Sequence, residues 1–128
     1  MRDFVDILSF TLSIGTLEGL ENSVVAASVE ALNKIDLLEH KGGHPRKGVV
    51  DLIPIHPITE QASLEECGQV AQRISQKLTS MFPSLSVFHF GHADLPLKRD
   101  LVTMRKKMGW FNEDPPETKY GFSGIGML

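Results

Sequence analysis

The sequence has few of the features that mark secreted, membrane or nucleic-acid-binding proteins. Its single cysteine, Cys67, excludes an internal disulfide or a multi-cysteine zinc site and fits a reducing compartment. No run approaches the roughly 20 apolar residues that span a bilayer, and the apolar stretch 4–20 lacks the basic flank of a signal peptide. Basic residues (13) do not outnumber acidic residues (16), so the net charge of -3 offers no bulk attraction to nucleic acid or an anionic membrane. We expect a cytoplasmic protein with no nucleic-acid or membrane partner.

Length and composition favour one compact domain. The chain has 128 residues, which is within the usual size of a single domain and too short for two full-sized ones. Hydrophobic residues make up 41% and charged residues 23%, so the chain can bury a core and is unlike a disordered or collagen-like sequence. We expect residues 1–111 to form the domain, and residues 112–128 to form a linker and a truncated strand.

The hydropathy pattern predicts strands that alternate with helices. Runs of β-branched, aromatic and other apolar residues predict strands at 4–14, 49–55 and 85–90. Apolar positions spaced three and four apart predict helices at 17–38, at 63–81 and from Asp94 to Gly109. This order predicts an α/β arrangement with helices packed over a sheet.

Local signals define several of the expected boundaries. Thr16 is the expected N-cap of the first helix, and Ser63 with Glu66 forms the capping-box pattern of the second. Pro54 is expected to end the ladder of its strand or to keep that strand at a sheet edge. Cys67 falls on the apolar stripe of the second helix and is expected in the core.

Five histidines raise the question of a metal site. His40 and His44 have the spacing that zinc-binding helices use, but that spacing works only in a helix, and two glycines lie between them. His89 and His92 flank Gly91 at a strand end, where hydrogen-bonded loop histidines are the expected outcome. We therefore predict no metal.

The third predicted helix carries a cluster of basic residues that could form a phosphate-binding stripe. The competing interpretation is a solvated helix face, with cations near the C-terminus that complement the helix dipole. We favour the solvated face for this cluster, which consists of Lys98, Arg99, Arg105, Lys106 and Lys107.

The loop 40–46, together with Asp51, is the strongest candidate site. His44 precedes a rigid proline and lies beside Arg46, so the loop offers a group that moves protons near neutral pH and a fork that can hold a carboxylate. The alternative is a plain helix-to-strand connection with surface histidines. Strand alternation places Asp51 on the same side as Ile53. Asp51 either orients or balances the charge of other site residues, or it has only a structural, capping role. The face of the strand on which its side chain lies decides between these two.

The same segment resembles the signature of the formiminotransferase N-terminal subdomain family, H-x-G-x-H-P-R-x-G-A-x-D-x-x-P-x-x-P-V. Residues 40–58 read H-K-G-G-H-P-R-K-G-V-V-D-L-I-P-I-H-P-I. Two shorter stretches, 65–67 and 90–93, resemble further patterns of the family, and the resemblance extends over residues 14–110. The match is long and specific.

The resemblance implies an activity and roles for four residues. In this family a formimino one-carbon group passes from N-formiminoglutamate to tetrahydrofolate, which is the co-substrate, and no metal is implied. His44 takes the place of the proposed general base, with Arg46 as an anion holder, Asp51 as a supporting acid and His40 as a substrate-binding residue. An imidazole with an ordinary pKa near 6.5 suits removal of a proton from the attacking folate amine.

The sequence also departs from the family pattern. Gly43 replaces the glutamate that usually precedes H-P, and Ile7 and Leu8 stand where the family has a polar pair. We expect the second subdomain of the family to be missing. We expect a truncated member with at most weak activity; the alternative is a non-catalytic folate-binding or protein-interaction module. The expected fold is an α+β sandwich with a ferredoxin-like mixed sheet, helices on one face, and exposed sheet edges that support a homo-oligomer.

Overall fold

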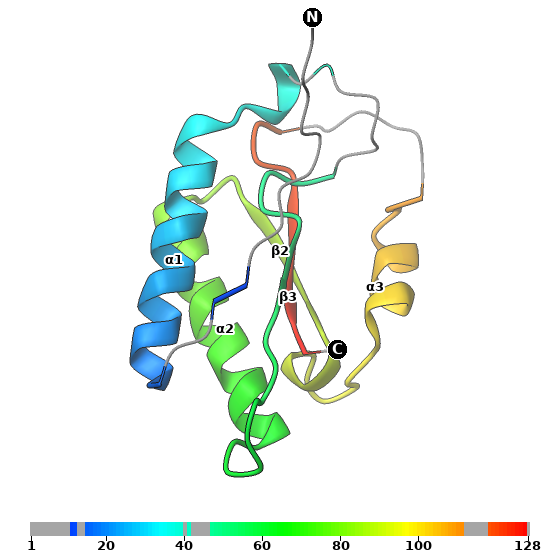
Figure 1. Ribbon diagram of the computed structural model, residues 1–128. Coiled ribbons are helices and arrows are strands. Elements are labelled where there is room, and N and C mark those ends of the chain that lie inside the picture. The colour runs from blue at the N-terminus through cyan, green and yellow to red at the C-terminus, as the bar shows by residue number, and fades with distance from the viewer. Residues whose placement is uncertain (1–10, 13–14, 40, 42–46, 112–117, 128) are drawn as a thin grey trace, which may run out of the picture.

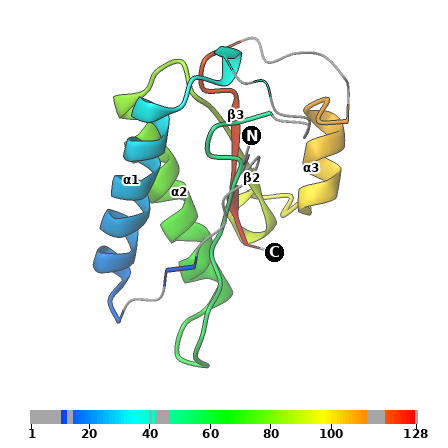
Figure 2. The same ribbon diagram turned by 45° about the horizontal axis from the view of Figure 1, so that its top comes forward.

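A three-stranded sheet lies between two helices on one side and a third helix on the other. The computed structural model describes residues 11–12, 15–39, 41, 47–111 and 118–127. Figure 1 shows the arrangement, and Figure 2 shows α3 standing across the sheet from α1 and α2. The elements are α1 (Leu17–Lys34), β1 (Leu52–Pro54), α2 (Leu64–Met81), β2 (Ser86–Phe90), α3 (Leu101–Lys107) and β3 (Phe122–Gly126), with 3-10 turns at Leu37–Glu39 and Gly91–Ala93. No helix in these described ranges is long and apolar enough to cross a membrane.

The first two helices begin where their capping residues predict. The Thr16 side chain accepts from the Gly19 amide at 3.0 Å. Ser63 and Glu66 each accept a hydrogen bond from the other's backbone N–H, so the capping box is complete. The first helix ends at Lys34, short of the expected 38, and a 3-10 turn follows.

The third helix starts later than predicted. It begins at Leu101, where the Asp100 side chain accepts from the Thr103 amide at 2.7 Å. Asp94, the expected start, is instead buried and accepts hydrogen bonds from Arg99. The two aspartates look alike as capping signals, and the prediction chose the wrong one.

The sheet has the order β1-β3-β2, and both pairings are parallel. The α/β class is therefore confirmed, but the described strands form a parallel rather than a mixed sheet. The predicted strand at 4–14 lies outside the described residues apart from 11–12, which are in no regular element. Among the described strands Pro54 lies on an edge strand, as predicted. The boundary predicted at residue 111 stays a prediction, although the strand expected beyond it is the central strand β3.

Apolar side chains pack on both faces of the sheet, which corrects the expectation of helices on one face. The larger cluster joins α1 and α2 to the sheet through residues such as Leu32, Ile74 and Ile125, and it includes Cys67, as predicted. The smaller cluster consists of Phe88, Phe90 and Met104, and it places α3 on the opposite face. Because β2 carries Phe88 and Phe90 on one face and Val87 on the other, it has apolar side chains to cover on both faces.

A buried carboxylate ties α1 to α2. Glu21 is only 6% exposed and accepts hydrogen bonds from Arg73 and Lys77, both on α2. Burial acts to raise the pKa of Glu21, but the two cations outweigh it and the pKa is lowered. The charges of Arg73 and Lys77 therefore point toward α1.

Candidate functional site

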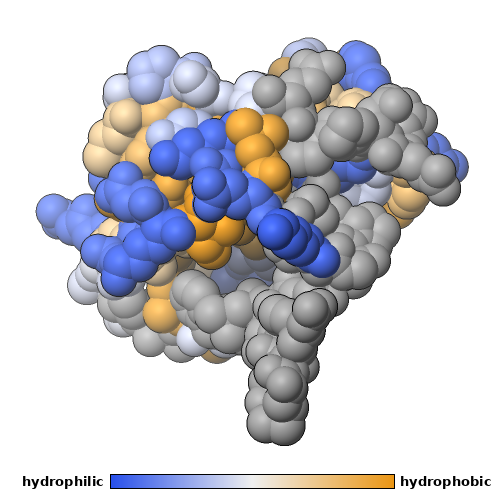
Figure 3. All heavy atoms as spheres, turned by 90° about the horizontal axis from the view of Figure 1, so that it is seen from above, coloured by the Kyte–Doolittle hydropathy of each residue, from blue (hydrophilic) through white to orange (hydrophobic). Residues whose placement is uncertain are grey.

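Only part of the predicted site lies within the described residues. His40, His44 and Arg46 lie outside them, so their predicted roles stay predictions. The described segment that follows enters the sheet beside the start of β3. Gly48 forms an antiparallel bridge with Gly121, and the Phe122 amide donates to the Lys47 carbonyl at 2.6 Å. Figure 3 views the molecule from above and shows hydrophilic side chains that border an apolar strip.

Asp51 is held just before β1 and faces α3. Its backbone carbonyl accepts from the Gly124 amide at 3.0 Å, and its Oδ2 lies 3.3 Å from Nη2 of Arg105. The Asp51 side chain is 47% exposed, whereas that of Arg105 is 20% exposed. This carboxylate of the signature motif is thus paired with a guanidinium and still reaches the surface.

Asp51 does not share a face with Ile53, contrary to the prediction from strand alternation. Ile53 packs in the cluster beneath α1 and α2, whereas Asp51 pairs with a residue of α3. The reason is that β1 starts at Leu52, so the alternation of a strand does not extend back to Asp51.

Arg105 is not on a solvated face, which corrects the prediction for the basic cluster. Its guanidinium carbon lies 4.1 Å from the centre of the Trp110 ring, a cation–π arrangement. Its Nε is buried without a hydrogen-bond partner among the described residues. Arg99 departs from the prediction in the same way, since it pairs with buried Asp94. Lys106 and Lys107 are exposed, as expected.

Sequence reasoning missed the grouping of Arg105 and Trp110 with Asp51. One signal was present, because a carboxylate inside an apolar run needs a partner of opposite charge. The partner is 54 residues away in the chain, however, and only the packing of α3 on the sheet selects it. Together the three residues offer a carboxylate, a guanidinium fork and an aromatic face.

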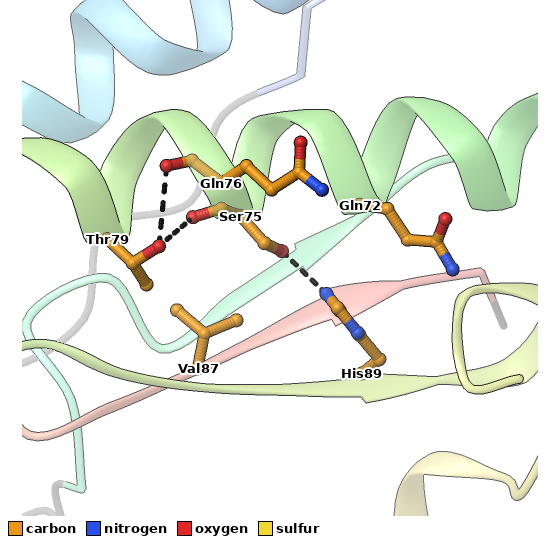
Figure 4. A pocket seen from close by; sticks show the side chains of 6 residues that line it. All are labelled: Gln72, Ser75, Gln76, Thr79, Val87 and His89. Carbon is orange, nitrogen blue, oxygen red and sulfur yellow. Dashed lines mark hydrogen bonds between the residues drawn. The ribbon is translucent and has the colours of Figure 1, made fainter.

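A second candidate feature is an open hollow of about 320 Å³ between α2 and β2. Figure 4 shows the side chains of Val87 and His89 rising from β2 toward α2. The lining residues are Gln72, Ser75, Gln76, Thr79, Val87 and His89.

The contact between His89 and Ser75 does not make a nucleophile and base pair. His89 Nε2 and Ser75 Oγ are 2.8 Å apart, but the Ser75 hydroxyl donates its proton to the Ala71 carbonyl at 2.8 Å. Ser75 must then accept from Nε2–H of His89, so the histidine is the donor. Burial lowers the pKa of His89, although nearby Asp94 opposes the shift. A neutral, donating imidazole at this position serves structure or recognition.

The described residues hold no cluster of metal-ligating side chains. No group of three or more histidines, cysteines or carboxylates lies close enough to bind an ion in this part of the chain. His92 approaches Glu65 only at 4.0 Å. The pair His40 and His44, which raised the question, lies outside the described residues.

Comparison with known families identifies the fold around Asp51. The family model for the N-terminal subdomain of the formiminotransferase domain matches residues 5–120. The chain belongs to this family. The resemblance stated from the sequence is therefore confirmed.

Known members of the formiminotransferase family are similar to most of this chain. A formiminotransferase cyclodeaminase-like protein of Arabidopsis thaliana is 34% identical over 88% of the chain and 37% of its own length. A glutamate formimidoyltransferase of Streptococcus pyogenes serotype M1 is 32% identical over 83% of the chain and 36% of its own length. A formimidoyltransferase-cyclodeaminase of Rattus norvegicus is 30% identical over 72% of the chain and 17% of its own length. The chain thus spans about a third, or less, of these formiminotransferase relatives.

Replacing Arg105 with alanine is expected to change the environment of Trp110 in this formiminotransferase subdomain. Trp110 is the sole tryptophan, so its emission reports directly on the cluster. Because Asp51 is half exposed, we expect a loss of only about 1 kcal/mol in the free energy of unfolding, from the ion pair and the stacking together. Fluorescence emission spectra and urea unfolding measure the two effects.

Lys107→Ala is the matched control, since it removes an exposed cation from the same helix end. Its emission spectrum is expected to equal that of the unaltered protein. An unchanged spectrum in Arg105→Ala would contradict the stacking of Arg105 on Trp110.

Proposed function

We propose that this chain takes part in folate-dependent transfer of a formimino one-carbon group to tetrahydrofolate, in the cytoplasm. The observation that carries the proposal is the family signature, whose described part presents the Asp51 carboxylate at the surface beside Arg105, which stacks on Trp110. Its other residues, His40, His44 and Arg46, precede Asp51 by 11, 7 and 5 positions in the same motif. The donor is a formiminoglutamate-like molecule, as the name of a glutamate formimidoyltransferase relative suggests.

His44 is the general base in this proposal. The folate amine attacks the formimino carbon and gives its proton to the His44 imidazole, and the bond from that carbon to the donor nitrogen breaks as the donor amine regains a proton. An imidazole gains and loses a proton near neutral pH, which matches both halves of this exchange. Arg46 holds a carboxylate of the donor or of folate, and Asp51 and His40 complete the binding residues.

A non-catalytic folate-binding or protein-interaction module is the second candidate function. Transfer requires donor and acceptor to be held together in attack geometry, and much of the rate enhancement comes from that positioning. The chain matches only about a third of the Arabidopsis and Streptococcus relatives. We therefore propose weak transfer for this chain by itself.

Folate binding and transfer are tested separately. The unaltered chain is expected to bind tetrahydrofolate or folinic acid, measured by calorimetry and by quenching of Trp110 emission. The His44→Ala variant is expected to bind folate still but to lose formimino transfer. The reason is that a general base removes a proton from the attacking amine and adds little to the affinity for folate. His56→Ala is the matched control, since His56 is exposed and fills a variable position of the signature.

The outcomes separate the candidates. No binding at about millimolar ligand, a free energy of only about -4 kcal/mol, removes both folate functions and leaves the interaction module. Loss of both binding and transfer in His44→Ala would make His44 a structural residue instead of a base.

A further inference from the structure

The last turn of α3 ends in a cap that folds Trp110 back over Arg105. The Gly109 amide donates to the Lys106 carbonyl at 3.2 Å, and the Trp110 amide donates to the Arg105 carbonyl at 2.9 Å. These two bonds form a Schellman motif, in which Gly109 takes the left-handed conformation with a φ of 71°. The side chains at the positions of Arg105 and Trp110 commonly contact each other in this motif. Here that contact is the stack of a guanidinium on an indole ring.

The Arg105 side chain is held between this ring and a carboxylate. Its guanidinium carbon lies 4.1 Å from the centre of the Trp110 ring, and its Nη2 lies 3.3 Å from Oδ2 of Asp51. Its Nε is buried and has no hydrogen-bond partner among the described residues. The plane of the guanidinium is therefore set by the stack on Trp110 and by the contact with Asp51, and not by a hydrogen bond at Nε.

Both partners of the ion pair are anchored to the sheet. The Asp51 carbonyl accepts from the Gly124 amide of the central strand β3 at 3.0 Å. Met104, which precedes Arg105 on α3, is buried in the cluster that contains Phe88 of β2. Backbone and core contacts thus fix the place where the carboxylate and the guanidinium meet. Side chains supported in this way by helices and strands hold their geometry more precisely than side chains on loops.

Stability alone does not account for this arrangement. The Asp51 side chain is 47% exposed, and ion pairs that reach solvent contribute little to stability. The Nε donor of Arg105 is buried without an acceptor in the described part of the chain, which costs free energy. What the arrangement supplies is a surface carboxylate with a fixed direction. Such a carboxylate loses less conformational entropy when it binds a ligand.

We propose that Arg105 is a positioning residue of the folate site: it holds the Asp51 carboxylate in one orientation, and Trp110 in turn holds Arg105. The effect on folate rests on the proposed function, in which Asp51 is a binding residue, whereas the coupling of Trp110 to Asp51 through Arg105 does not. The coupling and the effect on folate are therefore measured separately.

Trp110 emission tests the coupling without any ligand. Asp51→Asn is expected to change the emission of Trp110, the sole tryptophan, because a neutral amide holds the Arg105 guanidinium on the ring less firmly. In a chain that already carries Arg105→Gln, the same Asp51→Asn change is expected to leave the emission as it is, since no guanidinium joins the two residues. Circular dichroism and urea unfolding establish that each variant is folded. An emission that Asp51→Asn leaves unchanged, or changes equally in both backgrounds, would overturn the proposal.

Calorimetric titration with folinic acid tests the effect on folate. Arg105→Gln and Asp51→Asn are each expected to weaken binding about tenfold, and the double variant is expected to bind no more weakly than Asp51→Asn, because Arg105 acts through Asp51. Arg105→Lys is expected to recover only part of the loss, since an ammonium keeps the charge but has no planar fork to orient the carboxylate. Lys106→Gln is the matched control: it removes an exposed cation from the next position of α3 and is expected to bind as the unaltered chain does.

The outcomes distinguish positioning from other roles of Arg105. Losses that multiply to about a hundredfold in the double variant would overturn the proposal, because Arg105 would then bind the ligand independently of Asp51. Binding that Arg105→Gln leaves unchanged, or that Arg105→Lys restores fully, would overturn it as well. If the unaltered chain does not bind folinic acid but Trp110 emission shows the coupling, the proposed function fails, and Arg105 remains the residue that orients Asp51.

Discussion

Replacing Gly48 with alanine is expected to lower the free energy of unfolding by about 3 kcal/mol, because a side chain at this position meets backbone. A Cβ on Gly48 would lie 1.9 Å from the carbonyl oxygen of Phe122. A side chain could rotate away from such a contact, but Phe122 begins the central strand and its carbonyl is part of the main chain. The clash can be relieved only if the Lys47–Gly48 segment separates from β3.

The same substitution is expected to disturb the proposed site, since Gly48 is the glycine of H-P-R-x-G and holds the end of that motif against the sheet. Urea unfolding measures the stability, and folate titration measures the site. Gly15→Ala is the matched control, because a Cβ on Gly15 meets nothing within 4 Å. Equal stability of the two variants would contradict the close approach of Gly48 to Phe122.

Local sequence signals were sufficient to predict the first two helices. Thr16 and the Ser63–Glu66 pair mark helix starts through hydrogen bonds to residues three positions away, so the information lies within one turn. The periodic apolar stripe of α2 likewise predicted the burial of Cys67. The family signature supplied the candidate site, and the match to residues 5–120 confirmed the family.

The parts that sequence reasoning did not predict depend on residues far apart in the chain. A strand was expected within residues 112–128, but its place was not: Phe122–Gly126 is the central strand because it pairs with both β1 and β2. Arg105 looked like a solvated helix residue, because its partners Asp51 and Trp110 are brought to it only by packing. The roles of His44 and Arg46 rest on the family signature alone and stay predictions.

The Asp94–Arg99 pair controls the position of α3, and through it the position of Arg105. Asp94 is 8% exposed and accepts from Arg99 Nε at 2.7 Å, Nη2 at 2.8 Å and the backbone amide at 3.0 Å. The Arg99 carbonyl in turn accepts from the Gly91 amide at 2.7 Å. These bonds fix the connection between β2 and α3. The two-pronged geometry with Arg99 makes this one of the stronger kinds of ion pair.

Asp94→Asn is therefore expected to destabilise the fold by about 3 kcal/mol at neutral pH, because it removes one charge of a largely buried pair and leaves the other.

The hydrogen bonds from the Arg99 side chain lower the pKa of Asp94 below its ordinary value of 3.8. A carboxylate whose pKa is lowered by folding stabilises the fold at pH values above its ordinary pKa. This stabilisation is lost as the pH falls through the lower pKa of the folded state. The unaltered protein should lose stability steeply below about pH 4, and the difference from Asp94→Asn should shrink over that range. Urea unfolding from pH 7 down to about pH 2 measures the free energy of unfolding of both proteins against pH. Glu60→Gln is the control: Glu60 is exposed, so this variant is expected to lose stability below about pH 4 as steeply as the unaltered protein does. A constant difference between the unaltered protein and Asp94→Asn at every pH would contradict a stabilising charge on Asp94.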